Sequence, residues 1–261
     1  MNPAASGSGG QEAGKPEAGT FGVDAPKVPL ALGAAALLLT IVGCLLMIME
    51  GIVPGLVTLI FAVFFGLCAC SYLYTTLQGK FVWWVDLLDN ARLNGNEYAV
   101  DLGCGRGAVL ISLAKRLTTG RVSGIDLWRN QDQSDGDIED TKHNARVCGV
   151  EDRVELNTGS ITTLPYYDGQ FDLVVSSLAI HNLKAREDRR KAISEAVRVL
   201  EPGGKIIIAD TSHTEEYADW LSEAGMESVT VQDLGVRGWW GGPWMPTSAV
   251  TASRPGGRVT A

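Results

Sequence analysis

The chain is poor in basic residues. Its 261 residues include 22 Lys and Arg against 30 Asp and Glu, which gives a net charge of −8 and a pI near 4.9. A protein that binds nucleic acid neutralises phosphates with clustered Lys and Arg. The acidic balance therefore argues against a general nucleic-acid binder, and we expect no nucleic acid among the partners.

Cysteine and histidine are also scarce, with five Cys and three His. Cys68 and Cys70 are separated by a single residue and have no His nearby, so no metal-ligand spacing emerges. We therefore expect reduced thiols and no metal site.

Charged side chains are nearly absent between residues 28 and 74, where two apolar runs, 28–49 and 52–74, are interrupted only at Glu50 and Gly51. Each run has about the twenty residues needed to cross a hydrocarbon core of about 30 Å. The first run lacks the basic n-region of a signal peptide, and a second run follows at once. The sequence predicts a transmembrane helical hairpin at residues 28–75, with buried core helices of a soluble protein as the alternative.

The segments that flank the hairpin differ in composition. Residues 1–27 are rich in Gly, Ala, Ser, Pro and Glu without an apolar period, which predicts a disordered tail. Residues 76–95 have an approximate helical period and predict an amphipathic juxtamembrane connector. Its aromatic residues pack either at the membrane interface or on the soluble domain, and the sequence leaves both open.

Basic residues lie at the two ends of the hairpin, Lys15 and Lys27 before it and Lys80 after it, whereas Glu50 marks its turn. The positive-inside rule then places both termini and the following domain in the cytoplasm. We expect an integral membrane protein with the lipid bilayer as a partner.

Residues 96–261 alternate between strand and helix patterns and show no self-similar period that would indicate a solenoid. Such alternation predicts an α/β domain with a Rossmann-like, doubly wound, mostly parallel seven-stranded sheet, preceded by the two transmembrane helices. The expected strands are 98–102, 121–126, 154–157, 171–176, 205–209, 228–232 and 248–252, and the expected helices are 108–117, 138–148, 185–199 and 215–224.

A glycine turn follows the first expected strand. The stretch from Tyr98 to Gly107 reads YAVDLGCGRG and is followed by a helical pattern. Glycine permits positive φ and close approach of a ligand, and the helix directs its positive dipole end at the turn, so we expect a nucleotide-like ligand. In the dinucleotide fingerprint G-x-G-x-x-G the third glycine comes one residue later than it does here.

This arrangement resembles motif I of the class I S-adenosylmethionine (SAM) methyltransferases, and later stretches extend the resemblance over residues 96–253. The resemblance implies SAM as co-substrate, with glycines that make room for its methionine part and an acidic residue that holds its amino group. At the end of the second strand an Asp would accept the ribose hydroxyls, and the next two residues would flank the adenine. The residues implied are Asp101, Gly103, Cys104, Gly105, Gly107, Asp126, Leu127 and Trp128.

Three further stretches carry the resemblance. Where the family usually has Gly-Asp at the adenine, this chain has Gly159 and Ser160, so a hydroxyl replaces the carboxylate. The stretch 169–182 resembles motif IV, which faces the transferring methyl; it contains Ser176, implied at the cofactor, and His181, which either accepts a proton from the nucleophile or orders the loop. The Pro-Gly-Gly turn at residues 202–204 resembles the turn before strand five.

Two stretches depart from the family pattern. Residues 131–140 are rich in acidic side chains and form either a solvated loop or a lid. Residues 238–247 place three Trp in a Gly- and Pro-rich loop, which walls an apolar acceptor pocket, packs on the membrane surface or packs in the core.

Together these features predict a membrane-anchored methyltransferase that transfers the methyl group of SAM to a small, lipophilic acceptor. A membrane-tethered SAM-binding module without catalysis is one alternative. An NAD(P)-dependent oxidoreductase is another, opposed by the glycine spacing and by the lack of a Tyr-x-x-x-Lys pair. The acceptor atom and the oligomeric state are left open.

Overall fold

The computed structural model describes residues 19–128 and 137–256. The predicted seven-stranded sheet is confirmed, with strand order β3-β2-β1-β4-β5-β7-β6 and only β7 antiparallel to its neighbours. Parallel pairing from β3 through β5 places the carboxyl ends of these strands at one edge. The strands are β1 Tyr98–Leu102, β2 Arg121–Asp126, β3 Val154–Thr158, β4 Phe171–Ser177, β5 Leu200–Asp210, β6 Glu227–Asp233 and β7 Ser248–Ser253.

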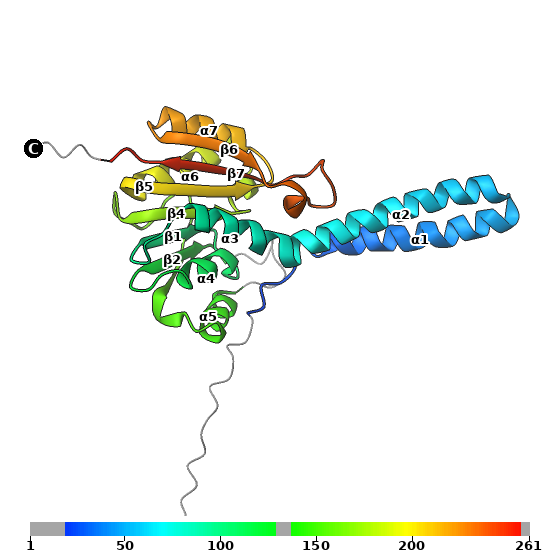
Figure 1. Ribbon diagram of the computed structural model, residues 1–261, viewed down its shortest axis with the longest axis horizontal. Helices are drawn as coiled ribbons and strands as arrows, with labels where there is room; N and C mark the ends of the chain where they lie inside the picture. The colour runs from blue at the N-terminus through cyan, green and yellow to red at the C-terminus, as the bar shows by residue number, and fades with distance from the viewer. Residues whose placement is uncertain (1–18, 129–136, 257–261) are drawn as a thin grey trace, which may run out of the picture.

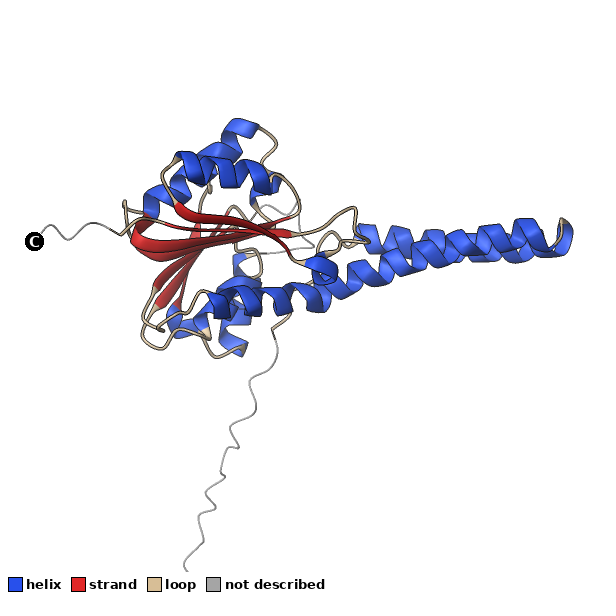
Figure 2. Ribbon diagram, turned by 45° about the horizontal axis from the view of Figure 1, so that its top comes forward, coloured by secondary structure: helices blue, strands red, loops and turns tan. Residues whose placement is uncertain are grey.

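Helices cover both faces of the sheet (Figure 2). One face packs against α3 Lys80–Asn90, α4 Ala108–Ala114 and α5 Ile138–Val147, and the other against α6 Arg186–Val199 and α7 Thr214–Glu223. Each face of the sheet has its own hydrophobic core, and alternate residues of β1 point into the two cores. Ala99 belongs to the core beneath α3, α4 and α5 and Val100 to the core beneath α6 and α7, and both residues are fully buried. Short helical turns occur at η2 Glu151–Arg153, η3 Ile180–Asn182 and η4 Gly235–Gly238.

Two long apolar helices, α1 Lys27–Met49 and α2 Ile52–Tyr74, project from the domain as a hairpin (Figure 1). They are long and apolar enough to cross a membrane, and most of their large apolar side chains are exposed. The two helices approach closely at glycine, because a Cβ on Gly55 would lie 2.7 Å from the Gly43 carbonyl oxygen. The hydroxyls of Thr40 and Thr58 donate to carbonyls four residues earlier, so neither hydroxyl is left unbonded.

Helix α2 runs into α3 through a π-helical turn, η1 Thr75–Gly79, so a continuous helix extends from Ile52 to Asn90. Helix α3, which lies within the predicted connector at 76–95, packs in the core of the domain. Trp83 and Trp84 are each only 2% exposed and pack in the core with α4. Of the two open interpretations of these aromatic residues, packing on the domain is the observed one.

Residues 19–26 also differ from prediction, because they pack against the domain although their composition indicates a disordered tail. The backbone N–H of Thr20 donates to Asn144 Oδ1 at 2.9 Å. Asp24 forms an ion pair with Lys80 at 2.7 Å and accepts from the Thr76 hydroxyl. These bonds join segments far apart in the sequence, which local composition cannot reveal. Residues 1–18 of the predicted tail lie outside the described residues.

The carboxyl edge of the sheet faces the hairpin. In Figure 1 the arrow of β5 points toward the base of α1 and α2, and β4 and β1 run parallel to it. Ligands of doubly wound sheets bind outside the carboxyl ends of the strands. The fold therefore puts the expected ligand edge on the side from which the apolar helices project.

Candidate active site

The glycine turn after β1 has the positive-φ backbone conformation that its glycines predict. Gly103 and Gly107 have φ of 75° and 83°, in the left-handed region that favours glycine. A Cβ on Gly103 would also lie 2.3 Å from the Cβ of Ala179, in the loop after β4. The turn therefore lies tightly against the β4 loop, and no larger residue fits at position 103.

Asp126, at the end of β2, organises this turn. One carboxylate oxygen accepts from the Gly105 N–H and the other from the Trp128 N–H, both at 2.9 Å. The Gly105 carbonyl accepts from the Thr141 hydroxyl of α5 at 2.6 Å. These bonds bring the two predicted regions, the glycine turn and the ribose-binding strand end, into direct contact.

Asp101 lies beneath the turn and is 1% exposed. Burial, with a smaller contribution from the negative charge of Asp126, raises the pKa of its carboxyl group to about 8, against the opposing effect of a hydrogen bond from the Leu110 backbone. Among the described residues, its Oδ1 atom has no hydrogen-bond partner. A buried carboxylate oxygen without a partner fits the positively charged amino group of SAM.

Cys104 is buried beside these two carboxylates. Burial raises the pKa of its thiol well above the usual value, and the charges of Asp101 and Asp126 add to the shift. The side chain is thus a protonated thiol that fills space at the turn. Its sulfur packs against Gly124 of β2, which leaves room for it because glycine has no side chain.

The remaining predicted cofactor residues lie along the same edge. The Gly159 N–H donates to the Asp126 carbonyl at 2.9 Å, which ties the β3 loop to β2. Ser160 shares a hydrogen bond with Thr162 at 2.8 Å, so its hydroxyl is partly engaged within its own loop. Leu127 is 40% exposed, and among the described residues the indole N–H of Trp128 has no partner.

Ser176, which the sequence predicts at the cofactor, lies near the carboxyl end of β4. Its hydroxyl donates to the Leu102 carbonyl at 2.8 Å, and the side chain is 1% exposed. This bond fixes β4 to the last residue of β1. Ser176 therefore holds the strand ends together behind the glycine turn, with its hydroxyl hydrogen already committed.

His181 pairs with a residue that the sequence interpretation did not single out. Its Nδ1 atom makes a close contact with Oδ1 of Asp210, the last residue of β5, and its backbone N–H donates to Oδ2 at 3.0 Å. Asp210 also accepts from the Thr211 N–H at 2.9 Å and from the Tyr217 hydroxyl at 3.4 Å. Burial, together with the charge of Asp210, raises the pKa of Tyr217, so the phenol stays a donor.

A carboxylate can only accept hydrogen bonds, and Asp210 accepts from all of these donors. It therefore orients the His181 imidazole so that Nδ1 carries the hydrogen. In the neutral form of the ring, Nε2 is then the nitrogen that could act as a base. Asp210, like Asp126, is the last residue of a strand, at the carboxyl edge of the sheet. This position is the sequence signal that could have identified Asp210 as a site residue.

The opposite rim of the turn is held by α5. Asn144 donates from Nδ2 to the carbonyls of Thr20 and Arg106 at 2.9 and 3.0 Å. Arg106 also pairs with Asp140 at 3.1 Å. Residues 19–22 are thereby held against the glycine turn. Most of the predicted acidic loop at 131–140, residues 131–136, lies outside the described residues.

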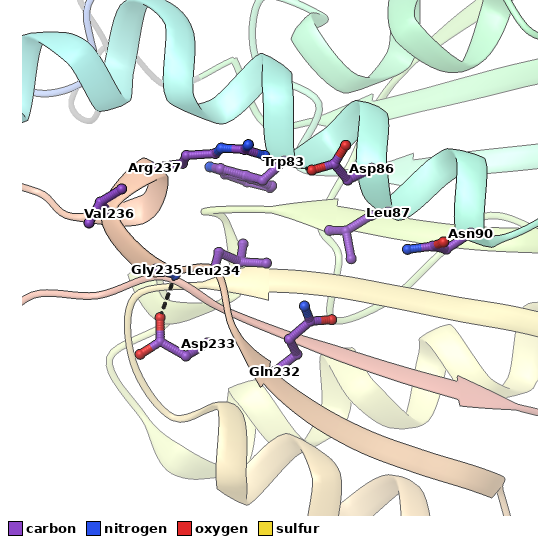
Figure 3. Close-up of a pocket in the computed structure, with 10 residues that line it drawn as sticks. All are labelled: Trp83, Asp86, Leu87, Asn90, Gln232, Asp233, Leu234, Gly235, Val236 and Arg237. Atoms are coloured by element: carbon purple, nitrogen blue, oxygen red, sulfur yellow. Dashed lines mark hydrogen bonds and ion pairs between the residues drawn. The ribbon is translucent and has the colours of Figure 1, made fainter.

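A separate cavity of about 280 Å³ lies between α3 and the end of β6 (Figure 3). Figure 3 shows Trp83, Asp86 and Leu87 on the helix side and Leu234 and Arg237 on the strand side. None of the residues predicted to bind SAM lines it. It lies on the face of the sheet that α3 covers, and no residue of the glycine turn lines it.

The comparisons with known proteins agree with this geometry. A sequence model of the family described as "Methyltransferase domain" matches residues 100–208. The demethylmenaquinone methyltransferase of Lactiplantibacillus plantarum is 32% identical over 135 residues, which cover 51% of this chain and 53% of the relative. The chain thus spans about half the length of this curated relative.

Two solved structures have the same fold. A SAM-dependent methyltransferase from Aquifex aeolicus superposes with a TM-score of 0.52 at 20% identity, covering 65% of this chain and 88% of that one. A geranyl diphosphate methyltransferase in complex with SAM gives 0.53 at 17% identity, covering 67% and 85%. Residues 100–208 therefore match the methyltransferase-domain family, and the domain that contains them has the fold of these SAM-dependent methyltransferase structures.

Proposed function

We propose that this protein is a SAM-dependent methyltransferase anchored in a membrane and acting on a small, lipophilic acceptor. The observation that carries the proposal is the glycine turn with the buried, unpartnered Asp101 oxygen beneath it. Asp101 would hold the amino group of SAM, the turn its methionine part, and Asp126 its ribose. When bound, SAM supplies a methyl group on a sulfonium for in-line displacement by a nucleophile.

His181 and Asp210 would carry the proton chemistry. The Asp210 carboxylate holds Nδ1–H, so Nε2 would accept the proton that a hydroxyl, amine or thiol acceptor loses as it attacks. The His181 side chain is 28% exposed, so part of the imidazole reaches the surface of the domain. The dyad favours an enzyme over a SAM-binding module without catalysis.

The proposed acceptor class follows from the position of the site. The carboxyl edge of the sheet faces two exposed apolar helices that are long enough to span a bilayer (Figure 1). The proteins named above are a demethylmenaquinone methyltransferase and a geranyl diphosphate methyltransferase. With Lys27 and Lys80 at one end of the hairpin and Glu50 at the other, both termini and the domain would lie in the cytoplasm.

The test is methyl transfer from radiolabelled SAM by the full-length protein in detergent, with host membrane lipids and soluble metabolites as separate acceptor pools. We expect label in the lipid pool, lost in Asp101→Ala and in His181→Gln. SAM binding, measured separately, should be lost in the first variant and kept in the second. Binding without transfer to either pool would support the binding module. Transfer only to the soluble pool would contradict the lipophilic acceptor.

A further inference from the structure

The tryptophan loop, residues 238–247, connects β6 to β7 through η4 and contains no charged side chain. It returns to the sheet at Ser248, which pairs with Asp210 of the candidate dyad. The loop therefore starts from the same edge of the sheet as the site. In Figure 1 it reaches from this edge toward the base of the hairpin.

The loop docks on α2. The Trp239 carbonyl accepts from the hydroxyls of Ser71 and Thr75 at 3.1 and 2.7 Å. Further along α2, the Trp240 ring packs edge-on against Tyr72 at 5.1 Å between centroids, and the Trp244 ring lies 5.6 Å from that of Phe64. The loop thus follows α2 from its carboxyl end toward its middle.

The contact with Phe64 sets a depth. A helix rises about 1.5 Å per residue, so the twelve steps from Ile52 to Phe64 span about 18 Å, whereas a hydrocarbon core is about 30 Å thick. Tilt of the helix would shorten that span further. If the hairpin crosses a bilayer, the Trp244 ring must lie inside the hydrocarbon rather than above it.

The backbone of the loop is suited to that environment. The N–H groups of Trp240 and Gly241 donate to the carbonyls of Met245 and Trp239, both at 3.0 Å, and the Thr247 N–H donates to Gly238 at 2.9 Å. The Trp240 indole N–H donates to the Thr247 hydroxyl at 2.9 Å. Non-helical backbone at membrane depth needs such internal partners because lipid offers none.

The outward side chains of the loop are apolar. Trp244 is 62% exposed and Met245 is 48% exposed, continuous with the exposed apolar surface of α2. An exposed tryptophan beside an exposed phenylalanine on a spanning helix requires an apolar partner.

We propose that the tryptophan loop is a third membrane element, inserted among the acyl chains of the cytoplasmic leaflet beside α2. Its partner is the hydrocarbon of the lipids, and its role is to hold the carboxyl edge of the sheet against the bilayer. The inference rests on the proposed membrane anchor and requires no methyltransferase activity.

The test measures the depth of Trp244 in the full-length protein, reconstituted in vesicles of phosphatidylcholine and phosphatidylglycerol. Subtracting the fluorescence of Trp244→Phe from that of the wild type isolates this residue. The matched control is Tyr167→Trp in the Trp244→Phe background, because Tyr167 is 85% exposed and precedes β4 at the opposite edge of the sheet. Lipids brominated along the acyl chains and aqueous iodide serve as quenchers.

We expect the Trp244 difference signal to be lost with brominated lipids and to resist iodide, while the signal added by Tyr167→Trp shows the reverse. Quenching of Trp244 by iodide and not by brominated lipids would overturn the inference. Alkaline carbonate extraction in parallel separates two failures. A chain that stays in the membrane with a water-exposed Trp244 refutes the inserted loop alone, whereas a chain released by carbonate refutes the proposed anchor as well.

Discussion

Asp101 makes the stability of the cofactor-free domain depend on pH. The pKa of its carboxyl group is about 8 in the folded protein against an ordinary value of 3.8. Between these values the folded domain keeps a proton that the unfolded chain releases. Stability therefore falls as the pH rises through this window, and the loss is complete above about pH 8.

The size of this effect follows from the shift. One pH unit corresponds to about 1.4 kcal/mol, so ionised Asp101 costs the folded state at most about 6 kcal/mol, of which about 3 kcal/mol appears between pH 5.5 and 8. At roughly 2–4 °C per kcal/mol for a domain of this size, the wild type should lose about 6–12 °C over that range relative to Asp101→Asn.

The assay is thermal unfolding of the purified protein in detergent at a series of pH values. Wild type without ligand should show the decline, Asp101→Asn should be flatter, and saturating SAM should flatten the wild-type curve because its amino group favours the carboxylate. Parallel curves for wild type and Asp101→Asn would refute the reasoning. A ligand effect that is the same in both proteins would refute the proposed contact between Asp101 and the amino group.

Three further outcomes are expected. Gly103→Ala should lower SAM affinity and thermal stability more than Gly203→Ala. Both positions have positive φ, but a Cβ at position 203 meets nothing within 4 Å. Equal effects of the two variants on SAM binding would contradict this expectation. His181→Gln should lower kcat by about 10²–10⁴ with SAM affinity unchanged; matched losses in both would indicate a loop-ordering role. Gly55→Leu should reduce the yield of monodisperse protein after detergent extraction, because a Cβ at position 55 would lie 2.4 Å from the Met47 side chain. Gly66→Leu should not, because a Cβ at position 66 meets nothing within 4 Å. Equal yields of the two variants would count against close hairpin packing.

Local patterns predicted much of the fold. The bounds of β1 and β2 coincide with prediction because an apolar run that ends at Asp or at a glycine turn marks both the strand and its end. The two apolar helices begin and end within one residue of the predicted runs, since Lys27, Glu50 and Gly51 mark their ends. At the site, Asp126 and the glycine turn were predicted together and lie together.

What the sequence did not show depends on contacts across long separations. The sequence left open where the aromatic residues after the hairpin pack, and only the structure shows that Trp84 donates from Nε1 to the Ser177 hydroxyl at 2.9 Å. Residues 19–26 have no periodic pattern, so nothing local indicates the bond between Thr20 and Asn144, 124 residues away. The pairing of His181 with Asp210 likewise depends on β4 and β5 lying side by side.

Two of these long-range contacts, those of Thr20 and Trp84, tie segments continuous with the hairpin to the domain that contains the site. The helix from Ile52 to Asn90 is continuous, and at η1 Gly79 packs so closely on the Arg237 carbonyl that a Cβ would lie 2.1 Å from its oxygen. The same helix contacts β4 through Trp84. A domain on a flexible linker samples many orientations, whereas this one would meet the bilayer in a single pose if the hairpin spans it as proposed. The fold would then set the height of the carboxyl edge above the membrane, as the proposed lipid-dissolved acceptor would require.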